Sequence, residues 1–383
     1  MNIAIASSGL GHVARGIETW AADTAAALHG RGARVTLFRG SGRPRRPYER
    51  TVPCLRRAGA ANRRLNRLLP APAWHLGLGN AYDIEQTTYA LNLMPMLGRR
   101  FDVVHTQDPL VALMLQRARR ARLVRAPAIL AHGTEEPLEW LQRIEFVQHL
   151  APQHLEEARR AGYDRPGWTA IGNFVDTDRF RPGRDDELRA GLDVPARACV
   201  VLSVAAVKRH HKRVDYLIEE VARFRERACP DAFLLVAGAE TGDSGALVTQ
   251  ARERLGHSAR FLLNQPRERM PRIYRTADVF ALCSLKEMMP IALLEATAAG
   301  LPALVSTHPV VGWMAGPGGR QVEMDRPGAL AEALEEFTDP DRRREVGRAA
   351  RRHAVENFGK EAIVKQYLEM YRDVVAMADG SAR

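Results

Sequence analysis

The stretch that decides the fold is Glu287-Met-Met-Pro-Ile-Ala-Leu-Leu-Glu295, which is followed closely by Gly300. It comes after an apolar run at 277–283 that is typical of a buried strand. A helix is predicted to begin near Pro290, since proline is favoured in a first turn, and to end at Gly300. Glu287 therefore falls in a loop at the carboxyl edge of a parallel sheet, where open α/β sheets bind ligands.

Two features of this stretch indicate the kind of ligand. Glu287 and Glu295 are expected to face the same crevice, and the N-terminus of the helix offers free N–H groups to an anion. A ligand with hydroxyls at one end and phosphates at the other fits both features, and a nucleotide sugar is such a ligand. The alternative is that Glu287 is solvated and that Glu295 lies on an exposed turn.

The two glutamates, with seven residues between them, and the apolar residues around them resemble the signature of the retaining glycosyltransferases of family 4. In that family the first glutamate contacts the donor sugar and the second contacts the ribose, which implies a catalytic role for Glu287. The family often has Gly-Phe-Gly after the first glutamate, and this chain departs from that pattern. The donor-binding residues implied in this stretch are Met288, Met289, Pro290, Ile291 and Glu295.

The resemblance implies an α/β chain with the GT-B fold. Such a fold has two Rossmann-like, doubly wound domains facing across a cleft and a C-terminal helix that crosses back to the N-terminal domain. Residues 170–180 resemble the hinge of the family. We therefore expect an acceptor-side domain at 1–172, a nucleotide-sugar-binding domain at 173–358 and a returning helix at 359–383.

Length and composition set the broad class of the protein. The 383 residues suffice for two domains, and 46% hydrophobic with 26% charged residues is typical of a globular chain. No apolar run approaches the roughly 20 residues of a membrane span. The first residues resemble a strand rather than a signal peptide, and the four cysteines are far apart, which argues against disulfides or a zinc site. The chain is expected to be cytoplasmic.

The net charge of +11 is concentrated in the first half of the chain. The first 180 residues carry 25 arginines, no lysine and 16 acidic residues. The arginines are densest from Arg43 to Arg67, where Leu65 and Leu68 accompany them. Such a segment can make peripheral contact with an anionic membrane, on its inner face, or be a solvated loop and helix. Nucleic-acid binding is not expected, because no aromatic platform accompanies the charge.

Residues 2–38 are predicted to form a strand, a glycine-containing loop, a helix and a second strand. The glycine spacing is not that of the dinucleotide fingerprint, which argues against NAD. The loop resembles the Gly-Gly-Ile-Glu with which family members open their first helix. The loop residues expected to face the donor phosphates and the acceptor are Gly9, Gly11, Arg15 and Gly16.

Two further strands, within 101–108 and 128–136, end in polar residues that we expect on one rim of the sheet. The resemblance implies that His132 lies near the donor sugar, as a second catalytic residue. The alternative is that each histidine is a structural hydrogen-bonding residue. The acceptor candidates are His105, Asp108 and Glu135. A helix is predicted for 149–163.

The second domain is predicted to begin with an apolar strand at 199–204, followed by a cationic loop and a helix from Val214. Cations at a helix N-terminus repel the helix dipole, and a bound anion would relieve that repulsion. In the family an arginine and a lysine here hold the donor diphosphate: Lys212 matches the lysine, and Lys208 or Arg209 replaces the arginine. The alternative is an exposed basic loop. Asn264 is implied near the nucleotide base.

The reaction implied is transfer of a sugar from a nucleoside-diphosphate sugar, UDP-linked, to an acceptor hydroxyl with retention at the anomeric carbon. No aspartate pair suggests a metal-held diphosphate, so we expect no cofactor and no metal. The runner-up enzymes are a sugar-nucleotide epimerase and a phosphorylase on the same fold. The non-enzyme alternative is a nucleotide-sugar-binding regulatory protein. A final amphipathic helix is predicted at 361–375, and neither the sugar nor the acceptor is readable from the sequence.

Overall fold

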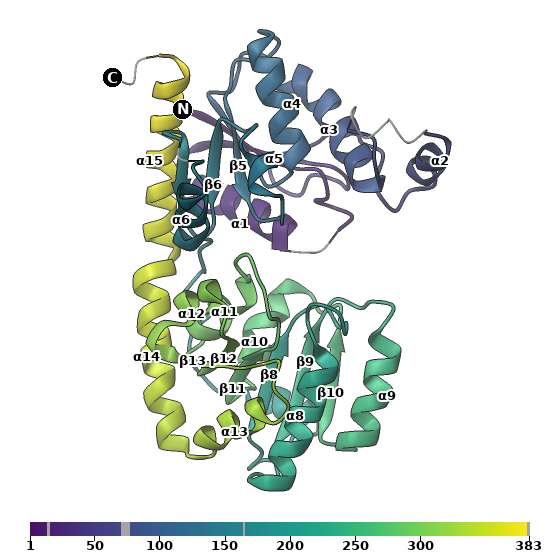
Figure 1. Cartoon of the computed structure of the whole chain (residues 1–383), viewed down its shortest axis with the longest axis vertical. Helices are drawn as coiled ribbons and strands as arrows, with labels where there is room; N and C mark the ends of the chain where they lie inside the picture. Colours follow the sequence, from purple (N-terminus) through teal and green to yellow (C-terminus); the bar gives the residue numbers. More distant parts are fainter. Residues whose placement is uncertain (14–15, 70–76, 164, 381–383) are drawn as a thin grey trace. The chain divides into compact units, whose positions relative to one another are not determined.

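The computed structural model describes residues 1–13, 16–69, 77–163 and 165–380. The chain divides into two compact units, unit 1 (Met1–Gly172 and Ile363–Arg383) and unit 2 (Asn173–Ala362). Each unit contains one parallel sheet with helices packed along it (Figure 1). None of the described helices is long and apolar enough to cross a membrane.

Unit 1 is built on a seven-stranded parallel sheet in the order β3-β2-β1-β4-β5-β6-β7. The strands are β1 (Asn2–Ser7), β2 (Arg34–Arg39), β3 (Glu49–Thr51), β4 (Val103–Thr106), β5 (Ala128–His132), β6 (Phe146–His149) and β7 (Trp168–Ala170). The helices are α1 (Gly16–Gly30), α2 (Ala60–Leu68), α3 (Ala81–Leu97), α4 (Pro109–Arg120), α5 (Leu138–Leu141), α6 (Pro152–Arg160) and the larger part of α15 (Lys360–Ala378).

Helices cover both faces of this sheet because successive residues of a buried strand point to opposite sides. Ala4 and Ala6 of β1 lie in one cluster with Tyr89 and Leu93 of α3. On the other face His105 of β4 packs against aromatic side chains of α1 and α15. The amphipathic helix predicted at 361–375 lies within α15, and Ile363, Tyr367, Met370 and Tyr371 on this helix are all buried.

Unit 2 contains a six-stranded sheet in the order β10-β9-β8-β11-β12-β13, again parallel. The strands are β8 (Val200–Val204), β9 (Phe233–Gly238), β10 (Ala259–Leu263), β11 (Val279–Leu282), β12 (Ala303–Ser306) and β13 (Gly319–Val322). The helices are α7 (Asp186–Gly191), α8 (Val214–Arg227), α9 (Ser244–Leu255), α10 (Met270–Tyr274), α11 (Ile291–Ala298), α12 (Pro309–Ala315), α13 (Ala329–Glu335) and α14 (Pro340–Phe358).

The strand and helix predicted around the two glutamates are confirmed. The apolar run forms β11, and α11 begins directly after Pro290. Gly300 has φ +76°, a left-handed conformation that ends the helix and that a residue with a Cβ adopts at a cost.

The helix predicted for 149–163 is wrong in its first turn. Phe146–His149 form β6, a fully buried strand that pairs with β5 and β7. The helix of this region is α6, which begins only at Pro152. Tertiary pairing with both neighbours decides the conformation here, because a short apolar run fits a strand as well as a helix.

Candidate functional site

The carboxyl edge of the unit 2 sheet has a topological switch point between β8 and β11. From β8 the chain continues to β9 on one side, while β11 lies on the other. In open α/β sheets the crevice at such a point is where ligands bind. The two loops that reach it are 205–213, after β8, and 283–290, after β11.

Glu287 and the cationic loop meet at this switch point. Lys212 Nζ donates a hydrogen bond to Glu287 Oε1, across 75 residues of sequence. His211 Nε2 lies 3.7 Å from the same oxygen and donates to the carbonyl of Lys286 at 2.9 Å. Only 8% of Glu287 is exposed. The structure thus brings together the two residues that the sequence assigned to the sugar and to the diphosphate.

The cationic loop is held in an unusual backbone conformation. His211 (φ +70°) and Arg213 (φ +52°) both have left-handed backbones, which cost about 1 kcal/mol or more for residues other than glycine. Arg213 is fixed by a hydrogen bond from Nη1 to the carbonyl of Met324 at 2.6 Å. Such local strain is common where a loop must present side chains to a ligand.

Lys208 and Arg209, the two substitutes for the family arginine, differ in their surroundings. Arg209 Nη1 lies 3.6 Å from Asp215 in the first turn of α8, and its backbone N–H donates to Asp243. No ion pair of Lys208 is present within the described ranges. Lys208 is therefore the better placed of the two to accompany Lys212 on a diphosphate.

Glu295 lies on α11 and is almost completely buried. The Tyr274 hydroxyl donates to Oε2 at 2.9 Å, and Arg267 Nη1 lies 3.1 Å from Oε1. Burial, followed by the charge of Glu295, raises the pKa of Tyr274 well above its ordinary value, so the hydroxyl keeps its proton and remains a donor. The carboxylate is thus oriented by two side chains before any ligand binds.

Some of the residues between the two glutamates pack into the interior of unit 2. Asn173 Nδ2 donates to the carbonyl of Met289 at 3.2 Å, and the Met289 side chain is buried. Met288 and Pro290 lie in the same loop as Met289. Ile291 begins α11, whose first N–H groups have no side-chain cap. Helix N-termini without a side-chain cap are common anion sites, so anion binding here stays a prediction.

Asn264 joins the loops that follow two neighbouring strands, β9 and β10. Its Oδ1 accepts from the backbone N–H of Glu240 at 3.0 Å, and its Nδ2 donates to the Glu240 carboxylate at 3.2 Å. Its own backbone has φ +51°. Asn264 therefore shapes the carboxyl edge beside the cationic loop.

The unit 1 sheet has its own switch point, between β1 and β4, and Asp108 lies there. The side chain of this acceptor candidate is buried and receives hydrogen bonds from the Ser8 backbone N–H at 2.6 Å and from the Tyr82 hydroxyl at 2.8 Å. Burial raises its pKa. Asp108 thus ties the loop after β1 to helix α3.

The expectation that His105 lies on a ligand-facing rim is wrong. Its side chain is fully buried, Nδ1 lies 2.8 Å from the Tyr371 hydroxyl, and its ring packs edge-on against Trp20. Burial lowers its pKa to about 3, so it is neutral. The cause is strand geometry: His105 precedes the last residue of β4, and its side chain points to a sheet face rather than beyond the edge.

The other two rim candidates differ in exposure. His132, the last residue of β5, is buried, with Nε2 3.8 Å from Glu136 and its ring packed against His149 and His154. Burial lowers the pKa of His149 to about 3. Glu135 is exposed in the following loop.

In the first loop, space requires glycine at Gly11, where a Cβ would meet fixed backbone, whereas at Gly9 it would meet the movable end of a side chain. A Cβ on Gly11, which has φ +104°, would lie 2.0 Å from the carbonyl oxygen of Ser41, and one on Gly9 would lie 2.2 Å from Glu18 Oε1. Gly16 has open space around it. Arg15, predicted in the same loop, lies outside the described residues.

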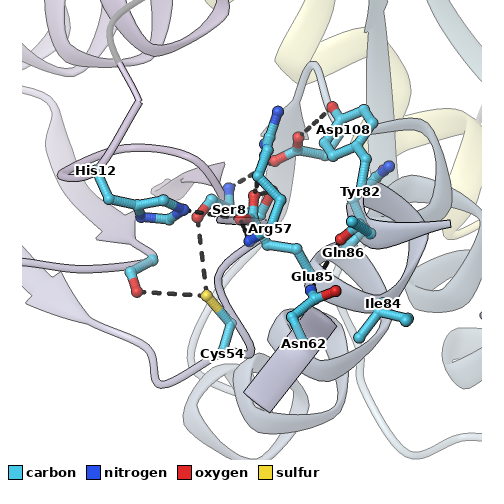
Figure 2. Close-up of polar contacts among 12 residues, drawn as sticks. Ser8, His12, Cys54, Arg57, Asn62, Tyr82, Ile84, Glu85, Gln86 and Asp108 are labelled. Carbon is cyan, nitrogen blue, oxygen red and sulfur yellow. Dashed lines mark hydrogen bonds and ion pairs between the residues drawn. The ribbon is translucent and has the colours of Figure 1, made fainter. Parts of the chain in front are cut away.

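The structure also shows residues that sequence reasoning missed. Glu85, His12 and Arg57 form a buried polar cluster beside Ser8 and Asp108 (Figure 2). Arg57 was counted only as part of the basic segment. His12 and Arg57 come from two different loops, and Glu85 comes from a helix. The three segments are far apart in sequence, so no local pattern connects them.

Comparison with known proteins identifies the second unit most directly. Residues 185–353 match the family model described as "Glycosyl transferases group 1". This range contains the cationic loop, Asn264 and both glutamates. The match covers less than half of the chain and lies entirely within unit 2.

Curated relatives of the chain include D-inositol 3-phosphate glycosyltransferases. That of Corynebacterium urealyticum is 31% identical over 220 residues, which cover 54% of this chain and 51% of the relative. That of Mycolicibacterium smegmatis is 28% identical over 314 residues, 79% of this chain and 69% of the relative. The chain thus spans about half the length of the first of these relatives and about two thirds of the second.

Solved structures share the fold over nearly the whole chain. The sucrose-phosphate synthase of Thermosynechococcus elongatus superposes with a TM-score of 0.77 at 21% identity, covering 98% of this chain and 99% of that one. Anabaena Alr3699/HepE in complex with UDP and glucose gives 0.72 at 16% identity, covering 96% and 98%. The chain therefore has the GT-B fold of two Rossmann-like units, and residues 185–353 are similar to the group 1 glycosyl transferases.

Proposed function

We propose that the chain is a retaining glycosyltransferase that moves a sugar from a nucleoside-diphosphate sugar to an acceptor hydroxyl. The observation that carries this proposal is the contact between Lys212 and Glu287 at the switch point of unit 2. A cation for a diphosphate and a carboxylate for a sugar lie side by side within the segment that matches the glycosyl transferase family. UDP is the nucleotide we favour, because a neighbour of the same fold was solved with UDP and glucose.

The donor roles follow from the chemistry of each side chain. Lys212 with Lys208 or Arg209 stabilises the charge that develops on the departing diphosphate, and the N-terminus of α11 adds to it. Glu295 accepts hydrogen bonds from the ribose hydroxyls, and Asn264 lies at the base. Glu287 orients the sugar, with Met288, Met289, Pro290 and Ile291 in the same pocket.

The reaction passes through a transition state of oxocarbenium character. The leaving phosphate takes the proton of the acceptor hydroxyl as the new bond forms, so no side chain of the chain is needed as a base. We assign residues 1–172 to the acceptor side, with Asp108 and Glu135 as remaining acceptor candidates, and residues 173–358 to the donor. His132 is a second candidate for a catalytic role, as the resemblance implies.

A panel of nucleotides tests the function. A ligand that binds only the folded state raises the melting temperature, so UDP and UDP-sugars should do so more than nucleosides. Incubation with the stabilising sugar nucleotide should then release free diphosphate, faster with an acceptor present. None of the three alternatives is favoured by the comparisons: an epimerase would return an isomerised donor, a phosphorylase would require inorganic phosphate, and a regulatory binder would turn over nothing.

Metal independence is the second expected result. Because Lys208, Arg209 and Lys212 supply the positive charge for the diphosphate, activity should persist in excess chelator. Transfer rates with and without chelator, and after added manganese, measure this. Loss of activity that manganese alone restores would overturn the assignment of these cations to the diphosphate.

Part of the basic segment from Arg43 to Arg67 forms ion pairs within unit 1. Arg39, next to the segment, pairs with Glu49 at 2.7 Å, and Arg57 pairs with buried Glu85. We infer that the segment is mainly a solvated part of the unit rather than a membrane anchor. The fraction of the protein that sediments with vesicles at low salt should then be equal for neutral and for acidic vesicles. Binding confined to acidic vesicles and released by salt would establish the membrane contact instead.

A further inference from the structure

A buried carboxylate at the switch point of unit 1 has no role in the donor chemistry. Glu85 lies on α3, and its side chain is fully buried. It accepts hydrogen bonds from the Arg57 backbone at 2.6 Å, from Arg57 Nε at 3.0 Å and from Nη2 at 2.5 Å, and His12 Nε2 lies 2.8 Å away (Figure 2). The buried side chain of Glu85 cannot touch a ligand. It does hold two other side chains, His12 and Arg57, which lie nearer the surface.

The charge state of Glu85 fixes the hydrogen on His12. Burial alone would raise the pKa of Glu85, but the hydrogen bonds from His12 and Arg57 outweigh burial and lower the pKa to about 2. An ionised carboxylate only accepts hydrogen bonds, so His12 Nε2 carries a hydrogen. In the neutral ring Nδ1 is then an acceptor with a free lone pair.

His12 Nδ1 is an unsatisfied group in a nearly enclosed place. The side chain is 9% exposed, and no residue of the described chain hydrogen-bonds to Nδ1, which is itself buried. A buried polar atom without a partner is unfavourable, and such atoms are uncommon in folded proteins. A hydroxyl that reaches Nδ1 would donate the missing hydrogen bond.

Arg57 is the second side chain that Glu85 holds. Its guanidinium lies over the Tyr82 ring, 4.1 Å from the ring centroid, and the side chain is 17% exposed. Nε and Nη2 are both bonded to Glu85. The hydrogen-bonding capacity left for a ligand is therefore mainly that of Nη1, which points away from this pair of bonds by the geometry of the guanidinium fork.

The position of the cluster agrees with a binding role. Ser8 and Asp108 follow β1 and β4, the two strands that flank the switch point, and His12 and Arg57 lie beside them (Figure 2). A Cβ on Gly9 would lie 3.1 Å from Arg57 Nη2, so the first loop passes directly against the guanidinium. Ligands of open α/β sheets bind at this place.

We propose that His12 and Arg57 bind the acceptor of the transfer reaction, that Glu85 is the residue that positions both, and that the acceptor is a polyhydroxyl compound. The proposal rests on the proposed glycosyl transfer. One hydroxyl donates to His12 Nδ1, and a neighbouring hydroxyl oxygen accepts from Arg57 Nη1.

The first experiment replaces the two contacting side chains and keeps their support. His12→Gln retains an amide that can donate to Glu85 and removes the acceptor at Nδ1, and Arg57→Lys retains the charge and removes the fork. Each should raise the acceptor KM about tenfold or more, since one hydrogen bond to a ligand is worth about a decade. UDP binding and hydrolysis of the donor without acceptor are measured on the same variants, so that a loss of acceptor binding is distinguished from a loss of donor chemistry.

The matched control is His29→Gln, an exposed histidine in the last turn of α1. It should leave the acceptor KM, the kcat and the melting temperature as they are. If His12→Gln resembles this control in acceptor KM, the proposed contact is wrong. If donor hydrolysis and UDP binding are absent from the unmodified protein as well, the proposed function has failed rather than this inference.

Glu85→Gln tests the positioning role separately from folding. It keeps the size of the side chain and removes the charge that holds Arg57 and His12. We expect the acceptor KM to rise at least as much as in His12→Gln, with kcat at saturating acceptor falling less than tenfold. A lower melting temperature with an unchanged acceptor KM would show a purely structural role and overturn the proposal.

The substrate class is tested with matched pairs of acceptors. Glucose, mannose and myo-inositol are compared with their monophosphates by release of nucleoside diphosphate above the rate without acceptor. We expect stimulation by at least one free polyol, because hydroxyl groups suffice for the contacts with His12 Nδ1 and Arg57 Nη1. Stimulation by the monophosphates alone would show that the site recognises a phosphate group. That result would overturn the acceptor class that we assign.

Discussion

Glu287→Gln should lower the rate of sugar transfer by about a hundredfold to a thousandfold while leaving the affinity for free UDP nearly unchanged. The estimate follows from the effect of removing one preorganised group that stabilises transition-state charge. Glu287 is proposed to touch only the sugar, where its contact strengthens as positive charge develops. In the free protein it also pairs with Lys212, so its loss frees a cation for the diphosphate and gives no reason for weaker UDP binding.

Glu295→Gln is the matched comparison, because its proposed partner, the ribose, belongs to donor and free nucleotide alike. It should weaken UDP binding about tenfold to a hundredfold, using ~1.4 kcal/mol per decade and roughly 1.5 to 3 kcal/mol for a hydrogen bond to a charged group. Glutamine is preferred to alanine here because Tyr274 and Arg267 both contact the side chain. Calorimetry with UDP and transfer rates measure both variants. Equal loss of UDP affinity in the two, or full turnover in Glu287→Gln, would contradict the division of roles.

The candidate donor-binding residues of unit 2 could be predicted because their signals are local. The apolar run of β11, Pro290 at the start of α11 and Gly300 at its end are each readable within a few residues. The contact between Lys212 and Glu287 required one more step, since the loops after two strands that flank a switch point must meet at one edge of the sheet.

The polar cluster of unit 1 could not be predicted in the same way. Helix α3 carries Glu85, Gln86 and Thr87 among its buried residues, so polar side chains interrupt the apolar period from which a helix is recognised. His105 shows the opposite problem: a polar residue near a strand end suggests a rim, but its side chain faces the aromatic residues of α15, which lie more than 250 residues away in sequence. Both cases depend on contacts between distant segments.

Glu220 is a further residue with no signal in the sequence, and it supports the fold around the donor site. It lies on α8, fully buried, and accepts hydrogen bonds from the backbone N–H groups of Gly328, Leu330 and Ala331 at 2.7, 3.0 and 3.1 Å. These groups belong to the first turn of α13, which has no side-chain cap of its own. One carboxylate from another helix thus satisfies donors that a helix normally leaves without partners.

Glu220→Ala should therefore destabilise unit 2 by about 3 to 5 kcal/mol, because it leaves several buried N–H groups unsatisfied and removes the partner of Arg223. The control is Glu219→Ala, the neighbouring residue on the same helix, whose carboxylate is partly exposed and bonded to Arg254 and Gln250. The Glu219→Ala substitution should lower the free energy of unfolding by no more than about 1 kcal/mol, as is usual for ion pairs near the surface. Urea unfolding followed by circular dichroism gives both values. Similar midpoints for the two variants would mean that water replaces the carboxylate at the start of α13, and that the helix needs no partner from α8.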